Sequence, residues 1–222
     1  MNQSKVDPTQ ASYYDQKYFK WQSPIGEFGG WANLAKFSEF VKKEDTVVDF
    51  GSGGGFLLSH IQCHKKMGIE INEAARASAK LIEIDSVADT DLLPDDFADV
   101  IISNHALEHT FSPLDELKKL RKKLKKGGKI IFVVPCESID YAYVKNDINN
   151  HIYTWSPMCL GNLFTQAGFE VIESKPYIHK WPPHYEKIAK LFGRRVFNFS
   201  CQIYARIERS YFQVRTIARR ID

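Results

Sequence analysis

The sequence lacks several patterns that assign a chain to a class at once. Its four cysteines are scattered, with no CxxC pair and no zinc-ligand spacing. No apolar run is long enough to cross a bilayer, and the first ten residues have no apolar core of the kind found in a signal peptide. The formal net charge of the 222 residues is only +3, too small by itself to indicate a nucleic-acid partner. We therefore expect reduced thiols, a cytoplasmic location and no nucleic-acid partner.

Short β-branched runs alternate with helical patterns through most of the chain, whose composition is 44% hydrophobic and 26% charged. This composition is typical of a globular protein with a substantial core. Strands that alternate with helices predict a parallel sheet covered by helices on both faces. The expected fold class is α/β, a doubly wound, mainly parallel seven-stranded sheet. The expected strands are residues 46–50, 66–71, 81–84, 98–103, 129–134, 169–173 and 212–218.

Local signals predict where helices between these strands begin and end. Ser112 can cap a helix whose first residue is Pro113, and the pair Gly127-Gly128 is expected to stop it. Ser156 repeats the cap at the start of the helix before the sixth strand. These signals support the alternation of strands and helices.

Two segments stand apart from this alternation. Residues 1–30 are rich in aromatic side chains and end at a flexible glycine pair, Gly29-Gly30, so we expect an N-terminal lid segment followed by a single domain, 31–222, that opens with a helix at 31–41. Residues 184–207, before the last strand, predict a basic amphipathic helical insert. Such a helix can cover the domain's own core, cover an acceptor, pair with a second subunit or rest on an anionic membrane.

Three alternating glycines, Gly51, Gly53 and Gly55, lie between the first expected strand and a helix. A tight strand-to-helix turn needs positive φ at some positions and no side chains where a ligand lies against the backbone. It also points unpaired helix N–H groups at the ligand. The spacing therefore predicts a nucleotide-binding turn.

Three residues around this turn separate the possible ligands. Phe56 occupies the position where the dinucleotide fingerprint GxGxxG requires its last glycine, and Asp49 precedes the turn, an unfavourable place for a pyrophosphate. S-adenosylmethionine has an ammonium and a sulfonium group and no phosphate. Glu70 ends the second expected strand, 21 residues after Asp49, where a carboxylate can accept hydrogen bonds from ribose hydroxyls. Together these residues favour S-adenosylmethionine over NAD.

Several stretches of the chain resemble the class I S-adenosylmethionine-dependent methyltransferases. VVDFGSGGG resembles the first motif of that family, and Glu70 in MGIEI matches its acidic ribose ligand. The resemblance continues through LLPDDFADVIISNHALEH, LKKLRKKLKKGGKIIFVVP and HIYTWSPMCLGNLFTQAGFEVIE. It covers roughly residues 31–173, with a closing strand at 212–218.

The resemblance implies a cofactor site at the carboxyl ends of the first four strands. The segment 81–94 is shorter than usual, so either Asp85 or Asp89 could lie beside the adenine, and Asp85 is preferred because it would end the expected third strand. Asn104 matches the position beside the methionine moiety. The expected cofactor-binding residues are Asp49, Gly51, Ser52, Gly53, Gly55, Glu70, Ile71, Asp85 and Asn104.

The acceptor side is less defined. A base is needed only if a hydroxyl must lose its proton, and histidine is the usual candidate because its pKa lies near neutral pH. The expected catalytic residues are His105, His151 and Tyr14, with Tyr14 in the lid. His105 could instead line the cofactor, since it matches a family position beside the methionine moiety, and His151 could instead satisfy local backbone groups. His109 is expected to be structural. Asp147 and His151 alone are too few ligands for a metal, so no metal is expected.

The sequence thus predicts a methyltransferase that uses S-adenosylmethionine on a small-molecule or glycan-like acceptor, with O-methylation favoured by the available histidines. Two alternatives remain at this point. One is an NAD-dependent oxidoreductase on a degenerate turn, and the other is a non-catalytic cofactor-binding protein. No asparagine/aspartate-Pro-Pro-aromatic motif follows the fourth strand, which disfavours RNA as acceptor.

Overall fold

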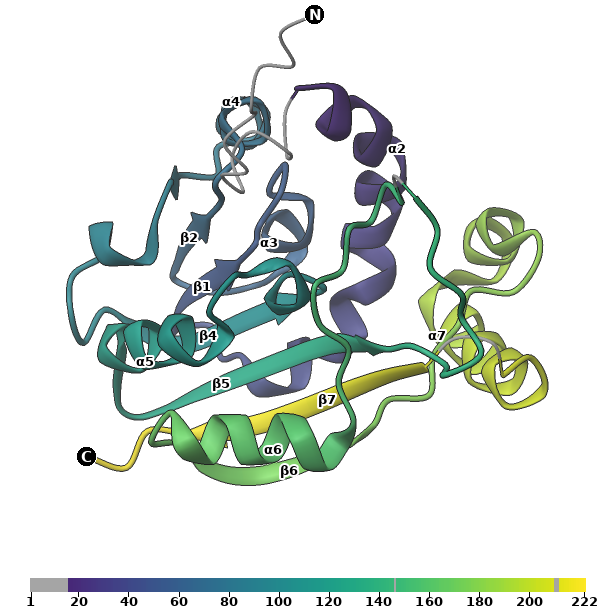
Figure 1. The fold of residues 1–222 in the computed structure, drawn as a ribbon. Coiled ribbons are helices and arrows are strands. Elements are labelled where there is room, and N and C mark those ends of the chain that lie inside the picture. The colour runs from purple at the N-terminus through teal and green to yellow at the C-terminus, as the bar shows by residue number, and fades with distance from the viewer. Residues whose placement is uncertain (1–15, 146, 210–211) are drawn as a thin grey trace, which may run out of the picture.

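A seven-stranded sheet forms the centre of the computed structural model, which describes residues 16–145, 147–209 and 212–222 (Figure 1). The strand order is β3-β2-β1-β4-β5-β7-β6, and β7 alone runs in the direction opposite to the other six strands. The expected fold class is confirmed. The strands are β1 (Thr46–Phe50), β2 (Lys65–Ile69), β3 (Ser86–Val87), β4 (Ala98–Asn104), β5 (Leu124–Cys136), β6 (Glu170–Pro176) and β7 (Phe212–Arg219).

Helices cover both faces of this sheet because successive residues of the buried strands point to opposite sides. On one face, Val48 and Ile101 pack in a core with leucines of α5 (Pro113–Lys123) and with α6 (Pro157–Gln166). On the other face, Val47 packs in a second core with α3 (Phe56–His60) and α4 (Glu73–Leu81). A third, aromatic core joins α2 (Gln16–Asn33) to α7 (Tyr185–Ile207).

The predicted helical insert is confirmed as α7, and the structure shows which of its faces is covered. Phe197 and Cys201 are buried against α2, whereas Leu191 and Phe199 are exposed. The helix is kinked at Gly193, which has φ 72° and ψ −178°. Within the described residues, no helix is long and apolar enough to cross a membrane.

The predicted third strand at 81–84 is wrong. Helix α4 continues to Leu81, and β3 begins only at Ser86. Ile84 is buried in the core shared with Ala79, so this stretch turns back onto α4 before the strand starts. As a consequence Asp85 precedes the third strand, and residues 88–90 follow it.

The predicted boundary at Gly29-Gly30 is also wrong as a break in structure, because α2 runs through both glycines to Asn33. Residues 34–36 and 38–40 then form two short 3-10 turns, η1 (Leu34–Lys36) and η2 (Ser38–Phe40), in place of the expected helix at 31–41. A Cβ on Gly30 would lie 2.5 Å from backbone atoms of Phe56. The glycine is therefore required for close packing of α2 against the start of α3.

The helix-end signals are confirmed at one helix and not at the other. Ser156 Oγ accepts a hydrogen bond from the N–H of Cys159 at 3.2 Å, as a cap should. Ser112 lies at the cap position of α5, but its side chain makes no cap bond. Helix α5 ends at Lys123 rather than at the glycines, because β5 begins at Leu124 and Gly127 forms a turn within it at φ 78°.

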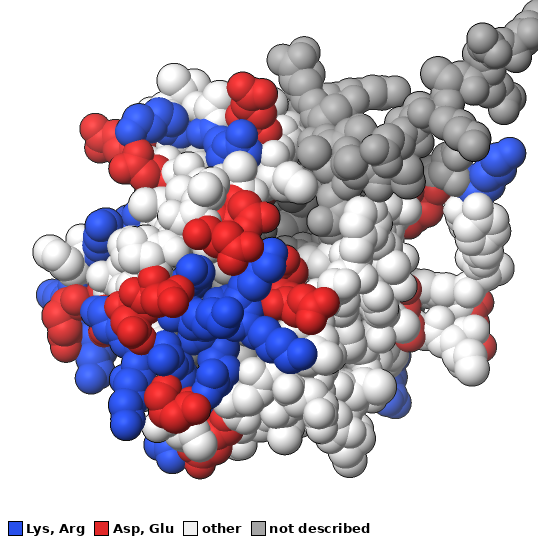
Figure 2. Space-filling view, turned by 60° about the vertical axis from the view of Figure 1, so that its left-hand side comes forward, with Lys and Arg blue, Asp and Glu red and all other residues white. Residues whose placement is uncertain are grey.

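Basic side chains around α5 are mixed with acidic ones. Figure 2 shows red and blue groups interleaved on this side of the molecule. Lys119 lies 3.1 Å from Glu116, and Lys123 lies 2.7 Å from Asp95. This face is therefore a mixed-charge surface and not a continuous basic one.

Candidate functional site

The glycine turn lies at the carboxyl edge of the sheet, where the parallel strands β1, β2, β3 and β4 all end. Gly51, Gly53 and Gly55 have φ of 76°, 52° and 78°, a region that favours glycine. A Cβ on Gly51 would stand 2.2 Å from the Cβ of Ala106. The turn therefore brings bare backbone to the cleft, as the spacing predicted.

Glu70 follows β2 and links the turn to the next element. Its Oε2 accepts a hydrogen bond from the N–H of Gly53, and its Oε1 accepts one from Asn72, both at 2.8 Å. Burial raises the pKa of Glu70, and these two backbone bonds oppose the rise. The carboxylate is fixed beside Gly53 on the wall of the cleft.

Asp49 lies on the other side of the turn, in the part of the cleft lined by Gly26, Gly30 and Asn104. Its side chain is buried, with 3% of the residue exposed. Burial, and then the charge of Glu70, raise its pKa well above the ordinary value. A ligand that brings positive charge to this position would favour the ionised carboxylate and offset the cost of its burial.

The end of β3 identifies which aspartate faces the cleft. Asp89 lines it together with Ala88 and Thr90, and one Asp89 oxygen caps the N–H of Asp91 at 2.8 Å. Asp85 lies before β3, is exposed, and pairs with Lys80 at 2.6 Å. The expected position of Asp85 is corrected, because the strand that was to place it at the cleft begins after it.

A buried lysine that the sequence analysis missed orients Asn104. Lys36 Nζ donates to Asn104 Oδ1 at 2.8 Å and to Gln213 Oε1 at 2.6 Å. Burial lowers the pKa of Lys36 to about 7, and the charges of Cys201 and Glu108 oppose this only in part. No sequence signal marks Lys36, since a lysine between apolar residues is ordinarily solvated.

His105 follows β4 with φ 58°, an unusual value for a histidine, and lines the cleft with His109. Its Nδ1 lies 3.3 Å from Oε1 of Glu108, and its Nε2 lies 3.3 Å from Oε1 of Gln213. Glu108 is fully buried. Burial raises its pKa, but the imidazoles of His105 and then His109 more than compensate and leave it below the ordinary value.

His151 is brought to this site from the loop between β5 and α6. Its Nδ1 is 2.6 Å from Oε1 of Glu137, and its ring lies 5.0 Å from that of His109, centroid to centroid. Glu137 was missed by the sequence analysis, although its place one residue after a strand was a usable signal. Tyr14 lies outside the described residues, while Phe19 of α2 lines the cleft.

The residues of the cleft fit S-adenosylmethionine. The turn offers backbone without side chains, Glu70 is an acceptor for ribose hydroxyls, and Asp49 complements a cationic group. Ser52 Oγ is buried and has no hydrogen-bond partner within the described residues. Among the described residues, no arginine or lysine lines these two parts of the cleft. This agrees with a cofactor that has no phosphate group to bind.

Comparison with known proteins agrees with this geometry. A family model described as "Methyltransferase domain" matches residues 27–174, well over half of the chain. The chain belongs to this family, and it is a class I methyltransferase whose cofactor is S-adenosylmethionine. This excludes the NAD-dependent and the non-catalytic alternatives.

Individual relatives are more distant. A ubiquinone biosynthesis O-methyltransferase of Idiomarina loihiensis is 28% identical over 181 residues, which cover 70% of this chain and 72% of that protein. A methyltransferase structure from Archaeoglobus fulgidus has a TM-score of 0.66 at 21% identity, covering 91% of this chain and 99% of that one. A Haemonchus contortus phosphoethanolamine N-methyltransferase in complex with S-adenosylhomocysteine has a TM-score of 0.65 at 14% identity, covering 96% and 60%. The two structures show that the fold is shared.

Proposed function

We propose that this enzyme transfers the methyl group of S-adenosylmethionine to a hydroxyl oxygen of a small-molecule or glycan-like acceptor in the cytoplasm. The observation that carries the proposal is the pair of His105 and Glu108. A histidine held at φ 58° on the cleft wall, with its Nδ1 3.3 Å from a fully buried carboxylate, is a strained and oriented group. Such a pair can accept a proton from a hydroxyl, whereas a neutral amine needs no base to attack.

The cofactor residues have separate tasks in this proposal. Gly51 and Gly53 offer backbone, whereas Gly55 packs against Ile84 and Ala79 and shapes the turn. Glu70 accepts from the ribose, and Asp49 favours the positively charged amino acid end. Asn104, held by Lys36, orients that same end. Ser52 and Ile71 complete the wall, and Asp89 replaces Asp85 beside the adenine.

S-adenosylmethionine supplies a methyl group already activated on a sulfonium. The protein then needs to align the acceptor and exclude water, and alignment alone can contribute roughly 7–11 kcal/mol. With Nδ1 of His105 held by Glu108, Nε2 would exchange its contact with Gln213 for the acceptor hydroxyl and take its proton, as the oxygen bonds to the methyl carbon and the carbon–sulfur bond of the cofactor breaks. Helix α2 closes the cleft beside the glycine turn, where Gly26 and Gly30 line the wall. Tyr14, ahead of α2, stays a predicted acceptor contact.

Support for an oxygen acceptor also comes from the names of relatives. The Idiomarina protein is named as an O-methyltransferase, and so is a malonyl-[acyl-carrier protein] O-methyltransferase of Marinomonas that is 28% identical over 104 residues, 41% of this chain and 38% of that protein. Their acceptors differ, so these names support the atom that is methylated and not the molecule that carries it.

A screen with isotope-labelled methyl donor tests the proposal. Phenols, saccharides and carboxylic acids are compared with amines of the same skeleton, and the product bond is located by mass spectrometry. We expect labelled ethers or esters, and His105→Asn, which tolerates positive φ, should lower kcat about 10²–10⁴-fold without changing cofactor affinity. His64→Asn, at an exposed histidine remote from the cleft, is the matched control. Labelled amines alone, or an unchanged kcat in His105→Asn, would refute the proposal.

A further inference from the structure

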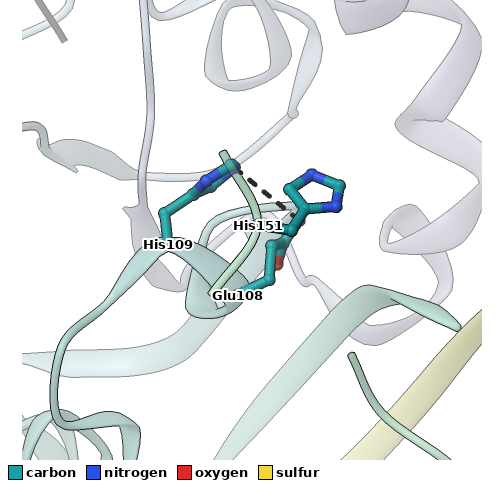
Figure 3. A group of neighbouring side chains, drawn as sticks. All are labelled: Glu108, His109 and His151. Atoms are coloured by element: carbon teal, nitrogen blue, oxygen red, sulfur yellow. Dashed lines mark ion pairs between the residues drawn. The ribbon is translucent and has the colours of Figure 1, made fainter. Parts of the chain in front are cut away.

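Three side chains beside the cleft converge although they come from distant segments. Glu108 and His109 end the 3-10 turn η4 (Leu107–His109), and His151 comes from the loop after β5. Each offers one potential ligand atom, and these atoms all lie within 4.8 Å of one another (Figure 3). The N–H groups of Ile152 and Tyr153 donate to the carbonyl oxygen of Glu108 at 3.0 and 3.2 Å. The backbone therefore fixes the loop that carries His151 against the turn that carries the other two.

Both imidazoles are oriented by a second hydrogen-bonding group. His151 Nδ1 lies 2.6 Å from Oε1 of Glu137, so Nδ1 donates to that carboxylate and Nε2 is the ring nitrogen left to bind a cation. The His109 ring donates to the backbone of Asn150, and its Nε2 faces Glu108 at 3.9 Å. A histidine that ligates a metal almost always donates its other nitrogen to a carboxylate or a backbone carbonyl.

The third group, Glu108, is a buried carboxylate that depends on the two neighbouring imidazoles for compensation of its charge. It is fully buried, and within the described residues its oxygens contact only its own backbone N–H and the two imidazoles, at 3.3 and 3.9 Å. Burying an ionised carboxylate is costly unless a charge or several donors compensate it. A divalent cation would supply that compensation directly, in place of charge on the imidazoles.

We propose that Glu108, His109 and His151 form a binding site for one divalent transition-metal cation. Two imidazole nitrogens and one carboxylate oxygen match the ligand sets of zinc and of non-haem iron. In tetrahedral zinc sites the donor atoms lie about 3.4 Å apart. The present separations need to shrink by little more than an ångström, which rotation of the side chains can provide.

The position of the site indicates what the cation does. His109 lines the same cleft as Glu70 and His105, and three protein ligands leave a coordination position open. A hydroxyl oxygen of the acceptor bound there would have its pKa lowered and would be aligned for attack. This role rests on the proposed function, whereas the cation site itself does not.

Metal binding by the full chain tests the site without any assay of activity. After treatment with chelator, Zn²⁺, Mn²⁺ and Co²⁺ are each titrated alone by calorimetry, and the Co²⁺ spectrum reports nitrogen and oxygen ligation. We expect one cation per chain. His151→Ala should abolish saturable binding, because the remaining pair of ligands is too weak, and Glu137→Ala should weaken it about 10–100-fold through loss of orientation.

The control variant is His64→Ala, which removes an exposed histidine away from the site and should bind the cation as the parent does. Each variant is checked for folding by the thermal shift that S-adenosylmethionine induces, since the glycine turn is untouched. Absence of stoichiometric binding to the parent, or equal affinity in His151→Ala, would overturn the site. A Co²⁺ spectrum dominated by thiolate ligation would do the same.

The outcome also separates this inference from the proposed function. Methyl transfer to hydroxyls that survives chelation and His151→Ala would leave O-methylation standing and refute the role of the cation. Stoichiometric cation binding with methyl transfer only to nitrogen would leave the site standing and refute O-methylation.

Discussion

The two parts of the cleft are built in different ways. Most of the cofactor part comes from one continuous run of chain, from β1 to residue 90, and uses backbone at the glycine turn together with three carboxylates; Asn104, at the end of β4, completes it. The acceptor part gathers side chains from η1, the end of β4, the loop after β5, and β7. Lys36 and Gln213, which hydrogen-bond at 2.6 Å, are 177 residues apart in sequence.

This difference decides how each part responds to change. Backbone that touches a ligand tolerates no new side chain, so substitutions at the glycine turn should act strongly and singly. Lys36 is hydrogen-bonded to both Asn104 and Gln213, so a substitution at any one of the three should also change the orientation of the others. The acceptor part is therefore the part that can vary between relatives with different acceptors.

The largest effect is expected from Gly51→Ala. The new Cβ would stand 2.2 Å from the Cβ of Ala106, at a φ of 76° that costs alanine about 1–2 kcal/mol. We expect cofactor affinity to fall at least about 100-fold, measured by calorimetric titration with S-adenosylmethionine.

Gly127→Ala is the matched control for this substitution. Its φ is 78°, but no atom of the described residues lies within 4 Å of the position that the new methyl group would take. It should lose only the conformational part of the stability and keep its cofactor affinity. Equal loss of affinity in both variants would show that strain, and not the close approach of backbone, limits binding.

Glu70→Gln should have the next largest effect. One amide oxygen replaces a carboxylate that already accepts from Gly53 and Asn72, so the ribose loses a charged acceptor. Hydrogen bonds to charged groups contribute about 1.5–3 kcal/mol, which predicts roughly 10- to 150-fold weaker cofactor binding. Glu73→Gln, exposed in the first turn of α4, should change nothing.

Lys36→Met examines the acceptor part through pH. The pKa of Lys36 is about 7 in the folded chain and near 10.5 when unfolded, so the unfolded state binds more protons between these values. The free energy of unfolding should therefore rise with pH above 7, by up to about 1.4 kcal/mol per pH unit from this group. Denaturant titrations between pH 7 and 9 should show a flatter profile in Lys36→Met; an identical slope would mean that Lys36 stays charged.

The smallest effect is expected from the two aspartates around β3. Asp89→Asn keeps the cap on Asp91 and should weaken cofactor binding only about 2- to 12-fold, the range of one hydrogen bond. Asp85→Asn should leave affinity unchanged, since its partner is Lys80 on the surface. Weaker cofactor binding in Asp85→Asn, with unchanged binding in Asp89→Asn, would mean that Asp85 is the residue beside the adenine.

Much of the cofactor part could be predicted from sequence. The glycine turn and Glu70 are set by neighbours within the same βαβ unit, and the fold class follows from the alternation of strands and helices. The third strand could not be placed from the sequence, because a strand of two residues shows no periodicity. The apolar residues Leu81 and Ile84, just before it, look like a strand instead. Similarly, Gly29-Gly30 indicates a break, and only the contact of Gly30 with Phe56 explains why a helix continues through it.

The acceptor part resisted prediction for a different reason. His105 and His151 were predicted because they follow strands, and they stay predicted acceptor contacts; their partners Glu108 and Glu137 were not assigned roles. Lys36 carried no signal, since its burial depends on Asn104 and Gln213 arriving from other strands.

The sequence by itself determined the class of enzyme, its cofactor and the backbone that holds it, because short-range geometry and the chemistry of a few adjacent residues are sufficient for those. Only the tertiary structure decided which aspartate faces the cleft, which lysine is buried, and which imidazoles lie beside a buried carboxylate. These depend on strand order, and on the insertion of β7 between β5 and β6, which brings distant side chains within hydrogen-bonding distance.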